Sequence, residues 1–353
     1  MRRSVPAALA VLLTLATTAG CAGQAAKPGA GPATPGPVRS GTAAPVKAPA
    51  LTEDEARGIV KDLAAKVEAD SFDAGYWKGI TEGPLLEQQL AVVATGEKYG
   101  TEREPGPTNS PATDPAVHTW TTGKDDGSDR WILGAHEVPA HTVGDEKKET
   151  VLRWSLFHQD RAGAPWHASF LARAPEPTAL PRVAVGPDGR AVTGGDTRGL
   201  AADPATVCGR YGDYLHTDLG AGGVKWSQDI TDLRESYAQG LAAQRKALGK
   251  PGKLEAGVEV ARAPHGPVWR TADGGALVAC TAVSKLYTEL GPGRSETFSA
   301  SGWAGTTGIP WASYTQRIMA LTVLAVPAGG SGEVSVAAQS NLPYSFEGTK
   351  FTG

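Results

Sequence analysis

The chain has 353 residues, with 34 basic and 37 acidic side chains and a formal net charge of −3. This length suits one large domain or two ordinary domains. The near-neutral balance, with no basic patch or charge run, disfavours nucleic-acid binding. The three cysteines form no Cys-x-x-Cys motif.

The N-terminus has the pattern of a secretion signal. Two arginines at positions 2 and 3 precede an apolar run at residues 7–16, which is too short to span a bilayer because a spanning helix needs about 20 apolar residues. Small residues then lead to Cys21 in "LATTAGCAGQ". This stretch resembles the lipobox of bacterial lipoproteins. The resemblance implies a signal peptide at residues 1–20, a lipid on Cys21 and a place on the extracytoplasmic face of the cell membrane. An ordinary secretory signal is the alternative.

The two remaining cysteines are Cys208 and Cys280. If the chain beyond Cys21 lies outside the cytoplasm, its compartment permits disulfides. One anchor and one bridge then account for all three cysteines, so we expect Cys208 to pair with Cys280. Two buried free thiols are the alternative.

Residues 21–50 are rich in Ala, Gly, Pro and Thr and contain no aromatic residue, Leu or Ile. Such a composition buries too little apolar surface to fold, so it predicts a disordered tether. Its charges are the cations Lys27, Arg39 and Lys47. They suit contact with anionic lipid, and plain solubility explains them equally well.

Similar features recur about 150 residues apart in the rest of the chain. Thr52 begins a helix with a capping box completed by Glu55, and Asp203 precedes a second helix start. Trp120 and Trp269 show nearly the same spacing. The chain is therefore expected to hold a tandem repeat of two similar units.

Each unit shows helical periodicity first and alternating, strand-like patterns afterwards. In the first unit we expect strands near 117–122, 130–138, 150–159 and 165–173, and in the second near 256–263, 266–272, 275–287, 314–326 and 332–340. Helices followed by a meandering antiparallel sheet make an α+β fold.

This element order is similar to that of the NTF2-like (cystatin-like) superfamily, and "GAPWHASFLARA" at 163–174 resembles a late strand of those domains. The resemblance implies tandem NTF2-like domains at 51–175 and 203–348, each with N-terminal helices packed on a curved antiparallel sheet. Residues 176–202 would form a linker with a small hairpin. The whole chain resembles uncharacterised secreted lipoproteins of high-GC Gram-positive bacteria.

The histidines do not form a recognisable catalytic or metal motif. In "HEVPAH" the two histidines, His136 and His141, are five residues apart with Pro139 between them, whereas the zinc-protease motif needs a spacing of four on a helix. We expect both to be exposed loop residues. His158 and His167 are expected to face each other across a hairpin as a cross-strand polar pair, with metal binding or proton transfer as the alternative. No catalytic residue, metal or cofactor is predicted.

The tryptophans offer the best candidates for a contact surface. Trp120 and Trp269 lie on predicted strands, where core packing is the ordinary role and lining a pocket for an apolar ligand is the alternative. Trp303 and Trp311 lie in a Gly-rich insertion and are expected to be exposed enough to contact a partner.

These features together predict a membrane-anchored extracytoplasmic lipoprotein that serves as a non-catalytic binding or assembly module of the cell envelope. Its expected partners are the membrane, through the lipid, and an envelope protein or apolar small molecule. A carrier of a lipid or other apolar ligand is one alternative, and it requires a continuous apolar cavity. A pocket enzyme of the isomerase or hydrolase type is another, and it requires a buried carboxyl group with a raised pKa.

Overall fold

A computed structural model describes residues 51–68, 71–100, 116–124, 127–139, 150–174, 180–216, 222–261, 264–298, 303 and 305–352. The predicted signal peptide, Cys21, the tether and His141 lie outside the described residues.

The elements follow the predicted order in both halves of the chain. The first half contains α1 (Glu53–Val67), α2 (Ala74–Ile80), α3 (Gly83–Tyr99), β1 (Val117–Thr122), β2 (Ser128–Pro139), β3 (Thr150–Arg161) and β4 (His167–Arg173). The second half contains α4 (Pro204–His216), α5 (Gln228–Leu248), β5 (Lys253–Ala261), β6 (Trp269–Arg270), β7 (Ala276–Glu289), β8 (Glu296–Thr297), β9 (Pro310–Val326) and β10 (Ser335–Lys350).

Side-chain caps fix the starts of the first helix in each half. The Glu55 backbone N–H donates to Thr52 Oγ1 at 3.2 Å, and the Thr52 backbone N–H donates to Glu55 Oε2 at 2.8 Å. The capping box predicted from the sequence is therefore present. At α4 the Ala205 N–H donates to the Asp203 carboxylate at 3.0 Å. Both caps satisfy backbone donors that a helix start leaves without an intrahelical acceptor.

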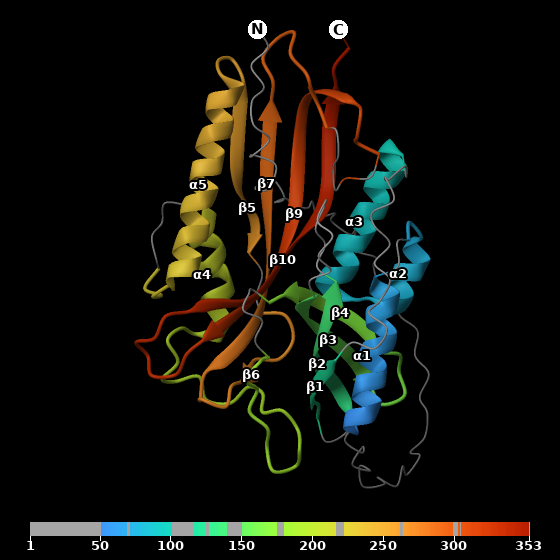
Figure 1. The fold of residues 1–353 in the computed structure, drawn as a ribbon, viewed down its shortest axis with the longest axis vertical. Coiled ribbons are helices and arrows are strands. Elements are labelled where there is room, and N and C mark those ends of the chain that lie inside the picture. Colours follow the sequence, from blue (N-terminus) through green and yellow to red (C-terminus); the bar gives the residue numbers. More distant parts are fainter. Residues whose placement is uncertain are drawn as a thin grey trace, which may run out of the picture.

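The strands form one large antiparallel sheet with the order β1-β2-β3-β4-β10-β9-β7-β5, while β6 pairs with β7 and β8 with β9. Each half contributes a four-stranded meander, and the two meanders meet last strand to last strand (Figure 1). The described pairing between β4 and β10 is limited to Arg173 opposite Gln339. The protein is therefore an α+β protein whose two meanders are joined at a narrow seam.

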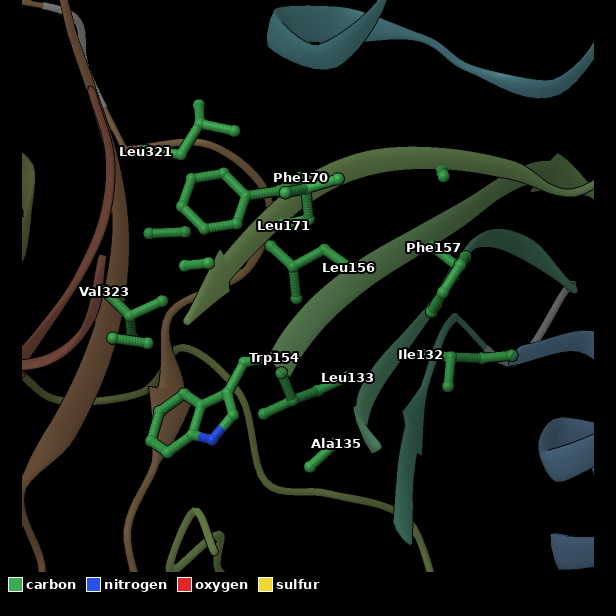
Figure 2. Close-up of a cluster of buried hydrophobic side chains, with 14 of the residues drawn as sticks. Ile132, Leu133, Ala135, Trp154, Leu156, Phe157, Phe170, Leu171, Leu321 and Val323 are labelled. Carbon is green, nitrogen blue, oxygen red and sulfur yellow. The ribbon is translucent and has the colours of Figure 1, made fainter. Parts of the chain in front are cut away.

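Side chains on opposite faces of the second meander pack against different layers. Val278 and Leu324 belong to a core with α4 and α5, whereas Leu321 and Val323 belong to a core with the first meander. Successive strand residues point to opposite faces, so this meander lies between its own helices and the first half. Figure 2 shows Trp154 of the first half pointing toward β9.

The opposite face of the first meander packs against α1. Gly134 of β2 allows the close approach, because a Cβ there would lie 3.0 Å from Val60 Cγ1 of α1 and 3.2 Å from Phe157. In Figure 2, Ile132 and Phe157 lie on this side of the sheet. The layers thus run from α1 through the two meanders to α4 and α5, and the two halves share one sheet and one main core.

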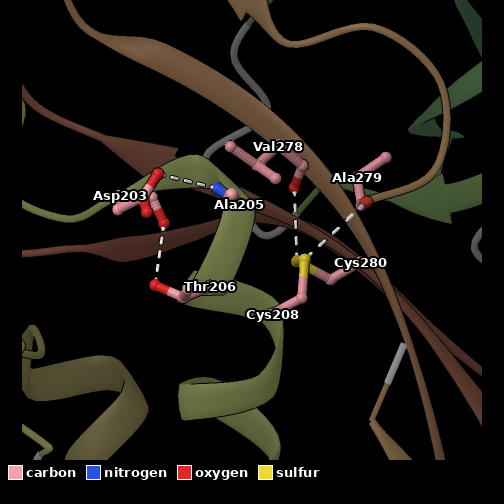
Figure 3. The surroundings of a disulfide bond; sticks show 7 residues. All are labelled: Asp203, Ala205, Thr206, Cys208, Val278, Ala279 and Cys280. Carbon is pink, nitrogen blue, oxygen red and sulfur yellow. Dashed lines mark hydrogen bonds between the residues drawn. A yellow bond between two sulfur atoms is a disulfide. The ribbon is translucent and has the colours of Figure 1, made fainter. Parts of the chain in front are cut away.

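A disulfide joins α4 to the second meander (Figure 3). Cys208 and Cys280 are both 2% exposed, their Cα atoms lie 5.2 Å apart and they are separated by 72 residues in sequence. The bonded sulfurs lie 3.8–3.9 Å from the carbonyl oxygens of Val278 and Ala279. These are packing contacts, since a disulfide sulfur carries no hydrogen. The predicted bridge is confirmed.

The segment between the halves contains the predicted small hairpin. Val185 bridges Ala191, and the Gly186 N–H donates to the Arg190 carbonyl at 2.8 Å. The hairpin is held beside β6, where the Arg270 N–H donates to the Val192 carbonyl at 2.8 Å. In the described ranges, no helix is both long and apolar enough to cross a membrane.

Candidate functional site

A cavity of about 340 Å³ lies where the two meanders meet. Its walls are mostly apolar and come from both halves of the chain and from the segment between them: Trp154, Ala174, Leu180, Pro181, Ala276, Leu277, Ala325, Val326, Pro327, Val336 and Ala337. It also includes Arg182, Thr271, Asp273, Gly275, Glu333 and Ser335. The cavity therefore combines an apolar interior with a few polar groups, which is the usual composition of a small-molecule site.

Strand ends shape this cavity. Ala276 begins β7, Val326 ends β9 and Ser335 begins β10, so the sheet stops at this point and leaves its apolar face partly uncovered. Trp154 of β3 and Leu277 of β7, each 4% exposed, supply buried walls from the two meanders. The site depends on both halves being packed together.

The charged side chains at the cavity form ion pairs, one of them with Lys225 outside the cavity lining. Arg182 Nη1 lies 3.7 Å from Asp273 Oδ2, and Glu333 Oε1 lies 3.0 Å from Lys225 Nζ. A hydrogen bond from the Thr271 hydroxyl lowers the pKa of the Asp273 carboxyl group. Because these ion pairs are solvent-exposed, they contribute little to stability, but they place charges of both signs beside an apolar interior.

The predicted pairing of His158 with His167 is confirmed, since the two residues lie opposite each other on β3 and β4. His158 Nδ1 lies 2.6 Å from Glu82 Oε1, and its Nε2 lies 3.4 Å from Asp129 Oδ1. Burial opposes protonation of His158, but the hydrogen bond and negative charge of Glu82 outweigh it and raise the pKa.

Trp131 completes the surroundings of this histidine. Its ring stacks on the His158 ring with centroids 4.2 Å apart, and its Nε1 donates to Asp129 Oδ1 at 2.8 Å. Asp129 has a positive φ of 52°, which a non-glycine residue adopts at some cost. Carboxylates therefore contact both ring nitrogens of His158, and neither nitrogen is free to act as a base. The cluster connects β2, β3 and the start of α3.

The expected exposure of Trp303 and Trp311 is wrong. They are 4% and 0% exposed and pack with Tyr314, Ile318 and Phe346. The reason is that β9 already begins at Pro310 and carries Trp311 into an aromatic cluster against Tyr99 at the end of α3, at a ring distance of 5.3 Å. These two residues therefore form core and no partner surface.

The other two candidate tryptophans also lie away from the cavity walls. Trp269 is 2% exposed and belongs to the main core, and Trp120 is half-buried against the same core. His136 was expected in an exposed loop, which is also wrong. His136 lies within β2 on the face that packs against α1, and it is only 3% exposed.

The pocket-enzyme hypothesis receives no support from the carboxyl groups. Those with a perturbed pKa in the described part of the chain, such as Asp129 and Asp273, have it lowered, whereas that hypothesis needs a raised value. The described residues also contain no group of three or more His, Cys, Asp or Glu side chains placed to hold a metal ion.

The fold and the cavity define a disulfide-linked α+β protein with an apolar site at the seam of one large antiparallel sheet. A family model described as a domain of unknown function, DUF8094, matches residues 47–342, so the chain belongs to that family. Comparison with curated proteins and with solved structures gives no match.

Proposed function

We propose that this chain is a lipid-anchored extracytoplasmic binding protein that holds an apolar ligand, or the apolar part of a larger one, in the cavity between the two meanders. The observation that carries this proposal is the cavity itself, whose volume of about 340 Å³ and apolar walls fall in the range typical of ligand sites.

The character of the cavity favours a carrier or binding protein over a pocket enzyme. Its titratable side chains are Arg182, Asp273 and Glu333. All three are substantially exposed and engaged in ion pairs. None is a buried acid or base of the kind that general acid–base catalysis needs.

The proposed location outside the cytoplasm, on the membrane, rests on the lipobox-like sequence at Cys21. The Cys208–Cys280 disulfide supports it, because structural disulfides persist mainly in oxidising compartments. The lipid on Cys21 would hold the protein at the membrane, and the tether would let the folded part reach a ligand or an envelope protein.

We also propose that each half is an NTF2-like unit. The support is the repeated order of helices followed by a four-stranded meander, and the mirrored strand order β1-β2-β3-β4 and β10-β9-β7-β5. In this proposal the two units are fused through β4 and β10 and share a core.

Filling the cavity is expected to weaken ligand binding. With N-phenyl-1-naphthylamine as an apolar fluorescent probe, the wild-type protein should show saturable binding, and Ala337→Trp should weaken it at least about tenfold because the indole occupies the space lined by Ala337. Ala162→Trp, at an exposed position, is the control and should bind normally. Equal binding by both variants would refute the cavity as the site.

The lipid anchor is tested separately. Cys21→Ser is expected to move the processed protein from the detergent phase to the aqueous phase or to leave an unprocessed precursor, because acyl chains supply the membrane affinity. Phase partitioning and intact mass measure the change. A processed Cys21→Ser protein that still partitions into detergent would contradict the anchor, without bearing on the cavity.

A further inference from the structure

Three basic side chains form a row across the first meander. His136 of β2 lies opposite Arg153 of β3, and Arg153 lies opposite Arg173 of β4. Residues directly opposite each other on adjacent strands point to the same face with their Cβ atoms about 5 Å apart. The row therefore gathers an imidazole and two guanidinium groups on one face of the sheet.

This face is the one that α1 covers. Arg153 forms an ion pair with Glu68, the C-cap residue of α1. Trp154 and Ala174, the residues that directly follow Arg153 and Arg173 in the chain, line the apolar cavity instead. Because successive residues alternate between faces, the basic row and the cavity lie on opposite faces of the same strands and are separate sites.

Positive charge exceeds negative charge in this row. Burial and the nearby charge of Arg173 lower the pKa of Arg153 to about 10. Glu68 is the carboxylate paired with Arg153, and no carboxylate among the described residues forms an ion pair with Arg173. Like charges held together in a partly buried place are costly unless a counter-charge joins them.

Buried polar atoms in the row also lack partners. His136 is 3% exposed, and neither of its ring nitrogens makes a hydrogen bond in the described part of the structure. The Nε of Arg153 also lacks a hydrogen-bond partner there. Buried polar groups are nearly always hydrogen-bonded in native proteins. The Arg153 side chain is 16% exposed and Arg173 is half-buried, so both side chains are partly exposed to solvent.

We propose that Arg153 and Arg173 bind a small oxyanion, with a phosphate group as the chemistry that fits best. The planar guanidinium donates parallel hydrogen bonds to two oxygens of a phosphate, and a phosphate has enough oxygens to serve two such groups at once. The anion supplies the negative charge that Glu68 alone does not. The phosphate is either free or the terminal group of a monoester.

Isothermal titration of the full-length protein with inorganic phosphate, at pH 7.5 and matched ionic strength, tests this site. The wild type should bind one phosphate per chain, and Arg173→Gln should weaken binding at least about tenfold. Arg161→Gln, at the exposed end of β3, removes the same charge elsewhere on the sheet and should bind like the wild type.

Two further measurements test whether Arg173→Gln affects stability and which phosphate compound the site binds. Without phosphate, Arg173→Gln should melt no lower than the wild type, because the substitution removes a like charge from beside Arg153. Glycerol 3-phosphate distinguishes the sources: binding of both compounds indicates recognition of the phosphate group alone, and binding of the ester only indicates a monoester ligand. Absence of saturable binding of either compound by the wild type, or equal affinity in Arg173→Gln, would overturn the proposal.

Discussion

Removing the Cys208–Cys280 disulfide is expected to lower the free energy of unfolding by about 4 kcal/mol, the chain-entropy value for a loop of this size. The bridge closes a 72-residue separation between α4 and β7. Without it, the unfolded chain gains freedom while the folded state keeps its other contacts. Urea unfolding followed by tryptophan fluorescence should show the loss as a lower midpoint, with a steeper slope because the unfolded chain without the cross-link exposes more surface.

The comparison is cleanest in a Cys21→Ser background, which leaves two cysteines in the chain. The double variant Cys208→Ala/Cys280→Ala and the reduced, alkylated protein should show lower stability than the oxidised protein. The intact mass before and after alkylation under non-reducing conditions establishes that both thiols are bonded. An oxidised and a reduced protein with the same urea midpoint would contradict the prediction.

The position of the bridge explains why its loss matters to the second half in particular. Cys208 and Cys280 belong to the core between α4 and the second meander, which also contains Tyr211, Trp226 and Ile230. This core is smaller than the one shared by the two meanders. A covalent link there supports a core with fewer buried apolar residues than the main core.

Local patterns in the sequence were sufficient to predict the order of helices and strands in each half, but not the short elements α2 and β8. The capping box at Thr52 and Glu55 and the helix start at Asp203 are local signals, because a side chain contacts backbone only two or three residues away. The disulfide followed from the count of cysteines and the expected compartment.

The arrangement of the sheet was not predictable in the same way. The seam between the meanders depends on Arg173 facing Gln339, and nothing in the periodicity of either strand specifies a partner so distant in sequence. For the same reason the cavity was missed: Trp154, Leu180, Leu277 and Ala337 come from separate segments, each of which is ordinary core sequence by itself.

Two single-residue errors have different physical causes. Trp311 and His136 were both assigned to exposed loops because glycine or proline lies near them in sequence. Strand β9 begins at Pro310, before the expected boundary, and therefore includes Trp311. His136 lies inside the expected strand, but its face of the sheet packs against α1, so the side chain is buried. Proline is tolerated at a strand end, so its presence did not mark the loop.

Acid is expected to destabilise this protein well above the pH at which carboxylates are protonated, and His136 is one cause. Burial lowers the pKa of His136 from 6.5 to about 4. The unfolded chain then binds the proton more tightly than the folded protein, so the full stability is present above about pH 6.5 and is lost progressively as the pH falls toward 4. At pH 5 the loss from this residue is about 2 kcal/mol.

His136→Leu should remove this loss, because neither ring nitrogen has a hydrogen-bond partner among the described residues and leucine fills a similar volume. Urea unfolding at pH 7.5 and pH 5 in phosphate-free buffer measures the difference. His118→Leu, at an exposed position on the neighbouring strand β1, is the matched control and should keep the wild-type pH dependence.

Two other histidines change the pH dependence of stability in opposite directions. Burial also lowers the pKa of His216 to about 4, so the variant His136→Leu should retain some acid sensitivity, which His136→Leu/His216→Leu should reduce further. His158 acts in the reverse sense: its pKa is raised, so its stabilisation is present below pH 6.5 and is lost as the pH rises through the raised value. If His136→Leu loses as much stability as the wild type between pH 7.5 and pH 5, folding does not lower the pKa of His136 and the prediction is wrong. The imidazole would then be protonated in the folded state at pH 5 and would add to the positive charge of Arg153 and Arg173.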